Sequence, residues 1–270
     1  MSGEKRRPEI WVLVSYALAA SGVVLIVILG SRPGGALPIF LYRTGTLALG
    51  LAAALCATVG FAVSALRRPV LQPGRLAGLL CAVGTLWAAS YPLAYPSSHE
   101  GHPSRVEFDL PFAGERRVRW AGRRREGNIL VLDPSRCFGI AFEPASGSSD
   151  PRREPVLAPA PGELVGWLED AVVVGVGAEE FLVLEGVVRS QGSPSEGVTV
   201  PRGGLLGTEG RRGLTMHLED RPTPGTGEGI PMRLFGLARE TGRGPLGSPE
   251  PGERVWSALP APGDPGLEGR

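Results

Sequence analysis

The sequence has few residues of the kinds that carry metal, redox and nucleophilic chemistry. Its 270 residues include three histidines and three cysteines. Two of the cysteines fall in apolar runs near the N-terminus, so the remainder of the chain cannot form a disulfide framework. The third, Cys137, is expected to be a small buried hydrophobic residue, because no histidine lies nearby in the sequence to activate it as a nucleophile.

Charge of one sign is also scarce. The chain has 28 basic and 27 acidic residues, which gives no electrostatic reason to propose a nucleic-acid partner. With 40 glycines and 26 prolines, helix is expected to be rare outside special segments. After Tyr95, no long pattern of helical period competes with the short apolar runs.

Three long apolar runs fill the N-terminal part of the chain. They cover residues 10–29, 46–66 and 76–95. A helix of about twenty residues spans about 30 Å, the thickness of a bilayer core. We therefore predict a membrane region over residues 1–97 with three transmembrane helices. None of the runs has an ionisable side chain at its centre, which favours an anchor over a transporter or a proton relay.

The basic residues predict the orientation of this region. Three precede the first run, two lie in the first loop, and three lie between the second and third runs. This distribution places the N-terminus and the second loop in the cytoplasm, and the domain after Tyr95 outside. The expected location is therefore the cytoplasmic membrane, crossed several times.

The stretch SSHEGHPS, residues 97–104, follows the third run. His99 and His102 within it would supply two metal ligands, but two donors on a proline-bounded stretch are too few to define a zinc site. A solvated linker is the expected structure.

Beyond this stretch, short apolar runs alternate with glycine- and proline-rich turns. Runs such as NILVLD, AVVVGV, EFLVLEGVV and GLTMHL are typical of strands. Their spacing predicts an all-β sandwich or barrel over residues 98–237. Residues 238–270 are rich in glycine, proline and charge, and are predicted to be a disordered tail in which Trp256 is at most a small docking point.

Four stretches of this β-like region, taken in order, resemble a known family. They are LPFAGERRVRWAGRRREGNILVLDPSRCFGIAF (110–142), PVLAPAPGELVGWLED (155–170), GSPSEGVTVPRGGLLGTEG (192–210) and GLTMHLEDRPTPGTGEGIPMRLFG (213–236). Each is similar to the corresponding block of the lysostaphin-type, or LytM-like, zinc metallopeptidases, which cut peptide cross-links in peptidoglycan. The resemblance implies the β-sandwich of that family, with its duplicated hybrid motif. It also implies a bacterial cell envelope, with the β domain on the periplasmic side of the inner membrane.

The family holds Zn²⁺ with two histidines and one aspartate, and leaves one position for the attacking water. Matched block by block, these ligand positions hold Leu130, Ala141 and Thr215 in this chain, and the family's catalytic histidines fall at Gly213 and Val188. Leucine and alanine have no lone pair to donate, and a neutral threonine hydroxyl is a poor zinc ligand by itself. The resemblance therefore implies a degenerate member without the zinc cofactor.

His217 is the one histidine after residue 102. On a strand it would point to the same side as Thr215 and Gly213, where it could border the former cleft. A plain structural role, hydrogen-bonded or facing solvent, is the favoured interpretation. Four carboxylates near the matching strands could contribute to a rebuilt metal site: Asp133, Glu143, Glu185 and Glu219. With a single histidine beside them, they are a weak basis for the three converging donors that zinc needs.

Three functions remain open on the sequence. The leading hypothesis is a membrane-anchored pseudo-enzyme that binds peptidoglycan or a partner protein and regulates cell-wall hydrolases. The second is a divergent, active zinc endopeptidase of peptidoglycan. The third is a barrel-sandwich adaptor, since APAPGELVGWL also resembles the hairpin of such domains. A lipoyl-type carrier is excluded because the chain beyond Tyr95 has no lysine, and the long helices typical of efflux-pump adaptors are not visible there.

Overall fold

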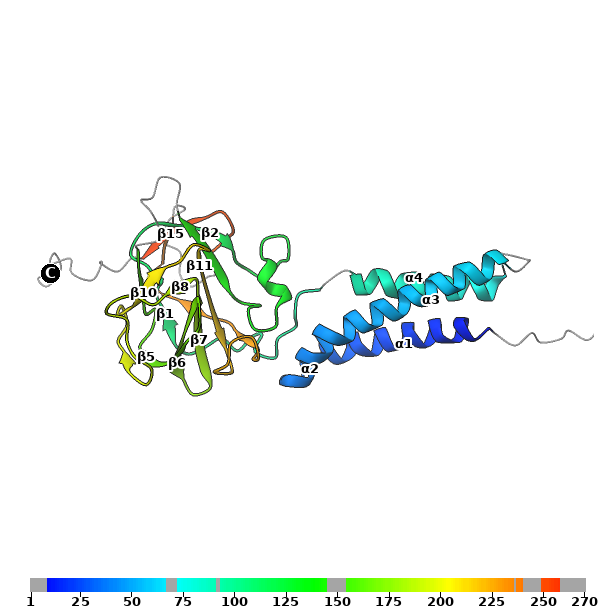
Figure 1. Cartoon of the computed structure of the whole chain (residues 1–270), viewed down its shortest axis with the longest axis horizontal. Helices are drawn as coiled ribbons and strands as arrows, with labels where there is room; N and C mark the ends of the chain where they lie inside the picture. The colour runs from blue at the N-terminus through cyan, green and yellow to red at the C-terminus, as the bar shows by residue number, and fades with distance from the viewer. Residues whose placement is uncertain are drawn as a thin grey trace, which may run out of the picture. The chain divides into compact units, whose positions relative to one another are not determined.

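The computed structural model describes residues 9–66, 72–90, 93–144, 154–235, 237–239 and 249–257. The chain divides into two compact units, Met1–Leu93 and Ala94–Arg270. The first unit is helical and the second is mostly β (Figure 1). The break falls slightly before residue 97, where the sequence predicts the end of the membrane region.

The helical unit contains three long helical segments. Its elements are α1 (Ile10–Gly30), α2 (Ala36–Phe40), η1 (Leu41–Gly45), α3 (Thr46–Leu66) and α4 (Pro73–Ser90). Because α2, the π-helical η1 and α3 follow one another without a break, residues 36–66 form one continuous rod.

Two of these segments are long and apolar enough to cross a membrane, judged by length and composition. They are Ile10–Gly30, with a mean hydropathy of 2.6, and Ala36–Leu66, with a mean hydropathy of 2.1. The third predicted apolar run forms helix α4, but α4 does not meet the length and hydropathy criteria for a membrane span. Its polar first turn, with Arg75, accounts for the difference, so the third transmembrane span stays a prediction.

Glycines let the three helical segments pack closely around Trp11 of α1. A Cβ at Gly60 of α3 would lie 2.5 Å from the indole, and one at Gly78 of α4 would lie 3.1 Å from it. The indole Nε1 donates to Glu9 over 2.7 Å, and Glu9 also forms an ion pair of 2.6 Å with Arg75 of α4. The first turns of α1 and α4 are therefore joined by a charged contact.

The β unit contains fifteen short strands among its described residues. They are β1 (Glu107–Phe108), β2 (Arg116–Trp120), β3 (Ile140–Pro144), β4 (Pro155–Leu157), β5 (Gly162–Trp167), β6 (Ala171–Gly177), β7 (Glu180–Glu185), β8 (Val187–Val188), β9 (Thr199–Val200), β10 (Leu205–Glu209), β11 (Leu214–Glu219), β12 (Gly229–Ile230), β13 (Arg233–Leu234), β14 (Leu237–Arg239) and β15 (Arg254–Ser257). One short 3₁₀ helix, η2 (Ile129–Leu132), lies between β2 and β3. The predicted β class of this region is confirmed.

The strands form one large sheet and two small ones. The large sheet has the order β14-β15-β2-β3-β11-β7-β6-β5-β9, with β12 paired to β11, and its pairs are antiparallel. A second sheet has the order β4-β10-β8, and β1 pairs with β13 in parallel. Strand β11 therefore lies between β3 and β7, with neighbours on both sides.

The hydrophobic core lies on one face of the large sheet. Side chains alternate across a strand, so Leu214, Met216 and Leu218 of β11 all enter the core. Phe112 and Phe142 meet there edge to face, with ring centroids 5.0 Å apart. The intervening residues of β11 point to the opposite face, where the candidate site lies.

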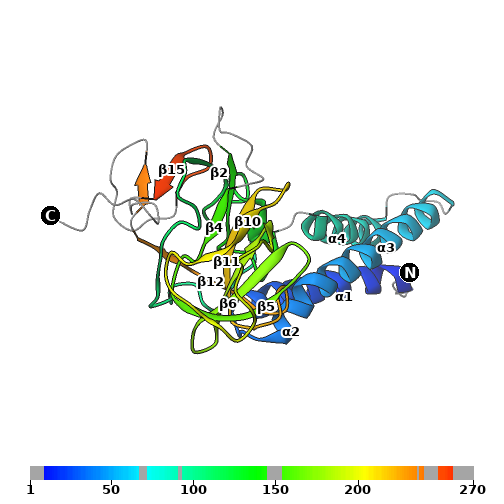
Figure 2. The same ribbon diagram turned by 60° about the vertical axis from the view of Figure 1, so that its left-hand side comes forward.

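Part of the predicted C-terminal tail belongs to the large sheet. Strand β15 pairs with β2, and β14 pairs with β15, so the predicted disorder is wrong for these strands (Figures 1 and 2). The physical reason is that Val255 is fully buried in the core cluster, and burial of this apolar side chain stabilises the strand. The composition of the tail does not predict this burial. Trp256 lies on β15 opposite Ala238 of β14. The remaining residues of the tail, 240–248 and 258–270, lie outside the described residues.

Candidate functional site

Strand β11 brings two of the three positions that match the family's zinc ligands side by side. Thr215 lies directly opposite Ala141 of β3 on one side and Glu185 of β7 on the other. Thr215 is partly exposed, whereas Ala141 is 6% exposed. The two positions are thus cross-strand neighbours.

The third position, Leu130, comes from the 3₁₀ helix η2. The buried Asn128 caps this helix, since its Oδ1 accepts from the Leu130 backbone N–H over 3.0 Å. Its Nδ2 donates to the carbonyls of Gly122 and Gly139. A Cβ at Gly139 would lie 3.2 Å from Leu130 Cδ1 and 3.3 Å from His217 Cβ. Leu130 therefore lies beside Gly139, next to His217 on the polar face of β11.

The residues at these positions do not fit a catalytic zinc ion. Zinc sites use cysteine, histidine or carboxylate donors, with at least three from the protein. Leu130 and Ala141 offer no donor, and Thr215 offers a neutral hydroxyl. Among the residues that the structure describes, no group of three or more histidine, cysteine, aspartate or glutamate side chains is placed to hold a metal ion.

An ion pair between Arg136 and Glu185 lies beside Thr215. Arg136 Nη2 is 2.6 Å from Glu185 Oε1, and Arg136 Nε is 3.8 Å from Asp133 Oδ2. The arginine side chain is 38% exposed and that of Glu185 is 24% exposed, so solvent screens the pair and its contribution to stability is about 0–1 kcal/mol. Asp133 also accepts hydrogen bonds from the backbone N–H and the hydroxyl of Ser135. Two of the four carboxylates that could rebuild a metal site are thus engaged with a cation.

The other two carboxylates point elsewhere. Glu143 lies opposite Arg117 in the β2–β3 pairing. Glu219 is fully buried at the far end of β11, where its two oxygens accept from the backbone N–H groups of Gly225 and Gly227. The four carboxylates therefore do not gather at one point.

His217 is buried, with 1% of its surface exposed. Its Nε2 lies 2.9 Å from Glu219 Oε1. Its Nδ1 is buried without a hydrogen-bond partner among the described residues. This arrangement ties His217 to the carboxylate that holds the loop at residues 225–227, which is the geometry of a hydrogen-bonded structural histidine.

Gly213 and Val188 are the positions that the sequence comparison assigns to the family's catalytic histidines, and they lie in different places: Gly213 directly precedes β11 at Leu214, and Val188 belongs to another sheet. Gly213 precedes the strand and has a φ of 78°, and a Cβ there would lie 2.9 Å from the Phe142 carbonyl oxygen. A histidine at this position would be strained and crowded. Val188 is 44% exposed and belongs to β8, in the separate three-stranded sheet. The shared-face argument for Gly213 therefore fails, because its backbone is not extended.

The stretch at residues 94–104, which we term the connecting segment, is bound to the β unit. The backbone N–H of Tyr95 donates to the Val131 carbonyl over 2.8 Å, and the Tyr95 hydroxyl donates to Glu228 over 2.8 Å. Ser97 and Ser98 donate to the same carboxylate. Tyr95, Ser97 and Glu228 are all buried. The expected solvated linker is wrong here, because a buried glutamate collects the donors of this segment.

His99 does not form a two-histidine site with His102. Its Nε2 lies 3.4 Å from Asp220 Oδ2. The hydrogen bond to Asp220 raises the pKa of His99, against the opposing effect of burial. Burial alone would raise the pKa of Asp220, but the bonds from His99 and the Glu228 backbone N–H lower it. The two groups therefore stabilise each other's charged forms.

A second buried charge cluster was not visible in the sequence. The guanidinium of Arg116, which is 1% exposed, forms ion pairs with Glu154 and with Glu209, the latter over 2.7 Å. It also lies 5.2 Å from the centroid of the Phe112 ring. Burial raises the pKa of Glu209, while Arg116 lowers it. The partners come from distant parts of the chain, so no local sequence motif predicts this cluster.

Cys137 is buried, as the sequence predicts. Burial raises the pKa of its thiol to about 12. The thiolate, which is the nucleophilic form, is therefore scarce near neutral pH.

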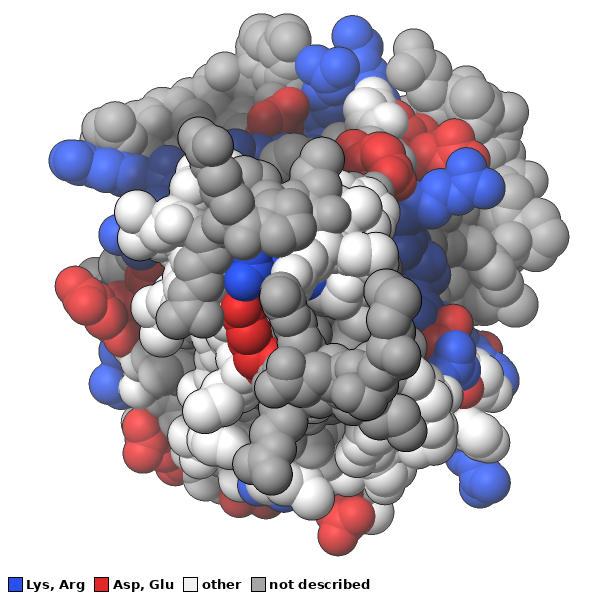
Figure 3. Space-filling model, turned by 90° about the vertical axis from the view of Figure 1, so that its right-hand side faces the viewer, with Lys and Arg blue, Asp and Glu red and all other residues white. Residues whose placement is uncertain are grey.

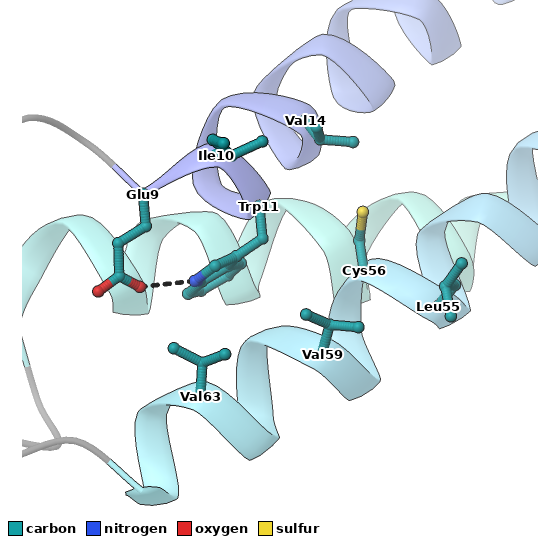
Figure 4. Close-up of a pocket in the computed structure, with 8 residues that line it drawn as sticks. All are labelled: Glu9, Ile10, Trp11, Val14, Leu55, Cys56, Val59 and Val63. Carbon is teal, nitrogen blue, oxygen red and sulfur yellow. Dashed lines mark hydrogen bonds between the residues drawn. The ribbon is translucent and has the colours of Figure 1, made fainter.

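The helical unit has its own groove, lined by α1 and α3 (Figure 4). It has a volume of about 570 Å³ and an apolar wall that includes Val14, Leu55 and Val59, with Trp11 and Glu9 at one end. On the face of the molecule in Figure 3, basic and acidic side chains of the described residues are interspersed, as the balanced composition implies.

Comparison with known proteins gives only distant matches. No family model and no curated protein sequence matches the chain. Among solved structures, similar ones include a provisionally named peptidase M23 from Pseudomonas aeruginosa, with 22% identity, a TM-score of 0.31, and coverage of 48% of this chain and 50% of that one. The M23 metalloprotease pseudoalterin from the deep sea has 13% identity and a TM-score of 0.32, covering 47% of this chain and 76% of that one.

Csd3 from Helicobacter pylori has 14% identity and a TM-score of 0.29, covering 43% of this chain and 32% of that one. The chain thus spans about half the length of the first of these structures. At such identities and TM-scores the assignment of a function rests on the residues themselves.

Proposed function

We propose that this protein is a membrane-anchored, catalytically inactive relative of the lysostaphin-type peptidases, acting in the bacterial cell envelope. The observation that supports the proposal is that Ala141 and Thr215 are cross-strand partners, while Leu130 lies beside Gly139, next to His217. None of these three residues offers a histidine, cysteine or carboxylate donor for zinc. The proposed role is to bind peptidoglycan or a partner protein, and so to regulate cell-wall hydrolysis.

A charged pair lies beside Thr215 on the proposed binding face. The ion pair of Arg136 and Glu185 gives this face a cation and an anion beside Thr215. Both side chains retain solvent exposure, so each can exchange its partner for a group on a ligand at small cost. A peptide carries both amide and charged groups, and such a face suits it better than it suits an uncharged glycan.

The packing of the helical unit supports three membrane spans rather than two. Helix α4 presents Leu76, Leu80, Val83 and Trp87 outward, all at least 45% exposed. It also approaches α3 closely, since a Cβ at Gly50 would lie 3.2 Å from the Ala89 Cβ. Apolar side chains on the outer face of a helix packed in this way suit contact with lipid.

The charged contact at the helix ends supports the predicted orientation. Glu9 and Arg75 belong to the first turns of α1 and α4, and their 2.6 Å contact places these two helix starts at the same end of the unit. With three spans, the N-terminus and the second loop then share the cytoplasmic side. The β unit would lie on the outer side, and reporter fusions after Tyr95 test this: activity of a cytoplasmic reporter there would overturn the orientation.

The test of the lost zinc site is metal content. The full chain, purified in detergent, is exposed to zinc, desalted and analysed for bound metal. We expect no stoichiometric zinc in the natural chain. Stoichiometric zinc would overturn the proposal and favour a divergent active endopeptidase.

A matched variant tests whether the three positions are correctly assigned. Leu130→His, Ala141→Asp and Thr215→His together supply the donor set that the family uses, so the triple variant is expected to bind one zinc per chain. A fourth change, Arg136→Ala, removes a cation that would repel the metal and is expected to raise the affinity. If neither variant binds zinc, the three positions do not form a ligand set.

A further inference from the structure

The groove between α1 and α3 is apolar along its length and polar at one end. On α1 its wall runs from Glu9 to Val14, and on α3 it runs from Leu55 to Val63. Figure 4 shows Trp11 reaching from α1 toward Val63, beside Glu9. Of the described residues that line the groove, Glu9 alone is charged. The groove therefore leads from a polar helix end into the apolar part of the helical unit.

The groove ends where α1 and α3 come together. A Cβ at Gly22 of α1 would lie 3.3 Å from Leu49 Cδ2 of α3. One at Gly45 of η1 would lie 3.8 Å from the side chain of Leu25 of α1. These contacts lie farther along α1 than Val14, the last residue of the α1 wall. The groove is therefore a short slot at one end of the contact between the two helices, closed at its apolar end.

The size of the groove decides between two kinds of occupant. Along α3 its wall runs from Leu55 to Val63, which is about 12 Å at a rise of about 1.5 Å per residue. A transmembrane helix of another chain would span about 30 Å. A 12 Å length of such a helix, about 10 Å wide, would occupy roughly 900 Å³, whereas the groove has a volume of about 570 Å³. The groove is therefore too short and too narrow for a helix, but it suits an acyl chain, which is a single flexible row of methylenes.

The polar end of the groove suits the level of lipid headgroups. Glu9 accepts from Trp11 Nε1 over 2.7 Å and forms an ion pair of 2.6 Å with Arg75. Charged side chains are costly in the hydrocarbon core of a bilayer, and tryptophan is enriched at its boundary with water. A phospholipid with its headgroup at this level would extend an acyl chain between Val14 and Val59, toward the closed end of the groove.

We propose that this groove is a lipid site, which holds one acyl chain of a phospholipid from the leaflet on the side of the N-terminus. This inference rests on the proposed membrane anchoring. Lipid chains and aliphatic side chains are equally apolar, so the binding would arise from close packing and not from a hydrophobic driving force. The bound chain would complete the packing of α1 against α3 in the region where the groove separates their surfaces.

Native mass spectrometry of the full chain in a mild detergent tests the proposal. The probe is phosphatidylcholine with two oleoyl chains, added to the purified protein. We expect one phosphatidylcholine to stay bound per chain. Glycerophosphocholine, which has the same headgroup but no acyl chains, should not displace it, because the groove holds the acyl chain and not the headgroup.

Matched variants test whether the lipid lies in the groove. Val14→Trp and Val59→Trp each put an indole into it, from α1 and from α3. Each should weaken lipid binding by about tenfold, because a filled site does not accept further methylenes without strain. The control is Val83→Trp on α4, outside the groove, which should bind lipid as the natural chain does. Val14, Val59 and Val83 are similarly exposed, at 40%, 42% and 48%. An unchanged helical circular dichroism signal shows that each variant is folded.

Three results would overturn the lipid site. The first is a natural chain that retains no phosphatidylcholine, and the second is equal retention in the groove variants and the control. The third is a dimer of the natural chain that the groove variants lose, which would assign the groove to a second copy. A chain that stays soluble without detergent would instead overturn the anchoring on which the proposal depends, so the two failures are distinguishable.

Discussion

The two ends of the polar face of strand β11 differ in what they hold. At the Thr215 end the neighbours are Ala141 and the partly exposed ion pair of Arg136 and Glu185. At the Glu219 end the polar side chains are buried, and Glu219 accepts hydrogen bonds from the loop at residues 225–227. Buried polar groups persist where each has partners, and a buried charge without partners is costly. The comparison indicates that this chain uses its buried carboxylates to hold loops and the connecting segment in place.

The Arg116 cluster should show the largest effect, because a single guanidinium, 1% exposed, pairs with two carboxylates. Replacing Arg116 by Met leaves two carboxylates, Glu154 and Glu209, without their cation. Breaking a buried ion pair from one side costs about 3–5 kcal/mol. The free energy of unfolding of the full chain in detergent, from denaturant titration of the β unit, measures this loss.

The control for this change is Arg117→Met, on the same strand. Arg117 is exposed, so its replacement should alter the free energy of unfolding by less than about 0.5 kcal/mol. Equal losses for the two variants would show that the strand tolerates neither substitution and that the buried cluster is not the cause.

The Glu228 anchor should show an intermediate effect. Glu228→Gln retains the shape but removes the negative charge that accepts from Tyr95, Ser97 and Ser98. Hydrogen bonds to a charged group contribute about 1.5–3 kcal/mol each, so we expect a loss of about 2–3 kcal/mol. Faster hydrogen exchange of residues 94–99 should accompany it.

Glu100→Gln is the matched change on the same connecting segment. Its ion pair with Arg123 is partly exposed, with 30% and 38% of the two side chains accessible. Its loss should cost at most about 1 kcal/mol. Should the two variants loosen residues 94–99 equally, burial of Glu228 would not be what holds the segment.

The pair of His99 and Asp220 should show the smallest effect, and one that depends on pH. The folded state raises the pKa of His99 above its ordinary value of 6.5, so this contribution is fully present below that pH and is lost as the pH rises through the raised value. The folded state lowers the pKa of Asp220 below its ordinary value of 3.8, so its contribution is present above that pH and is lost as the pH falls through the lowered value.

The stabilising window of the pair therefore lies between these two ordinary values. Both side chains are partly exposed, so the contribution is at most about 1 kcal/mol. Comparing His99→Gln with the natural chain inside the window and well above it measures the difference. A loss that does not change with pH would show that His99 acts by packing alone.

The sequence predicted the helices and the β class because both follow from local patterns of apolar residues. It also predicted that the matched zinc positions lack donors, since that is a matter of residue type alone. It failed for β15 because four residues, Arg254–Ser257, carry too little pattern to reveal a partner strand far away in the chain. It failed for the connecting segment because serine and histidine are typical of solvated linkers, whereas here Ser97 and Ser98 donate to the buried Glu228 and His99 contacts Asp220.

The structure also separated residues that the sequence had grouped. Gly213 and Thr215 are two residues apart, as residues on one face of a strand are. Gly213 has a positive φ, however, so β11 begins only at Leu214 and does not include it. His217 shares the face of Thr215 but is covered and bound to Glu219. Neither difference could be predicted from the alternation of residues, because the first depends on the backbone conformation of Gly213 and the second on what packs over His217.

By itself the sequence determined the apolar helices and the short strands, because these depend on the identity and spacing of neighbouring residues. Only the tertiary structure decided which buried charged side chains are paired with which partners. Arg116 meets Glu209 across 93 positions of sequence and Tyr95 meets Glu228 across 133. Such pairs form because burial makes an unpartnered charge costly, and burial is a property of the folded chain as a whole.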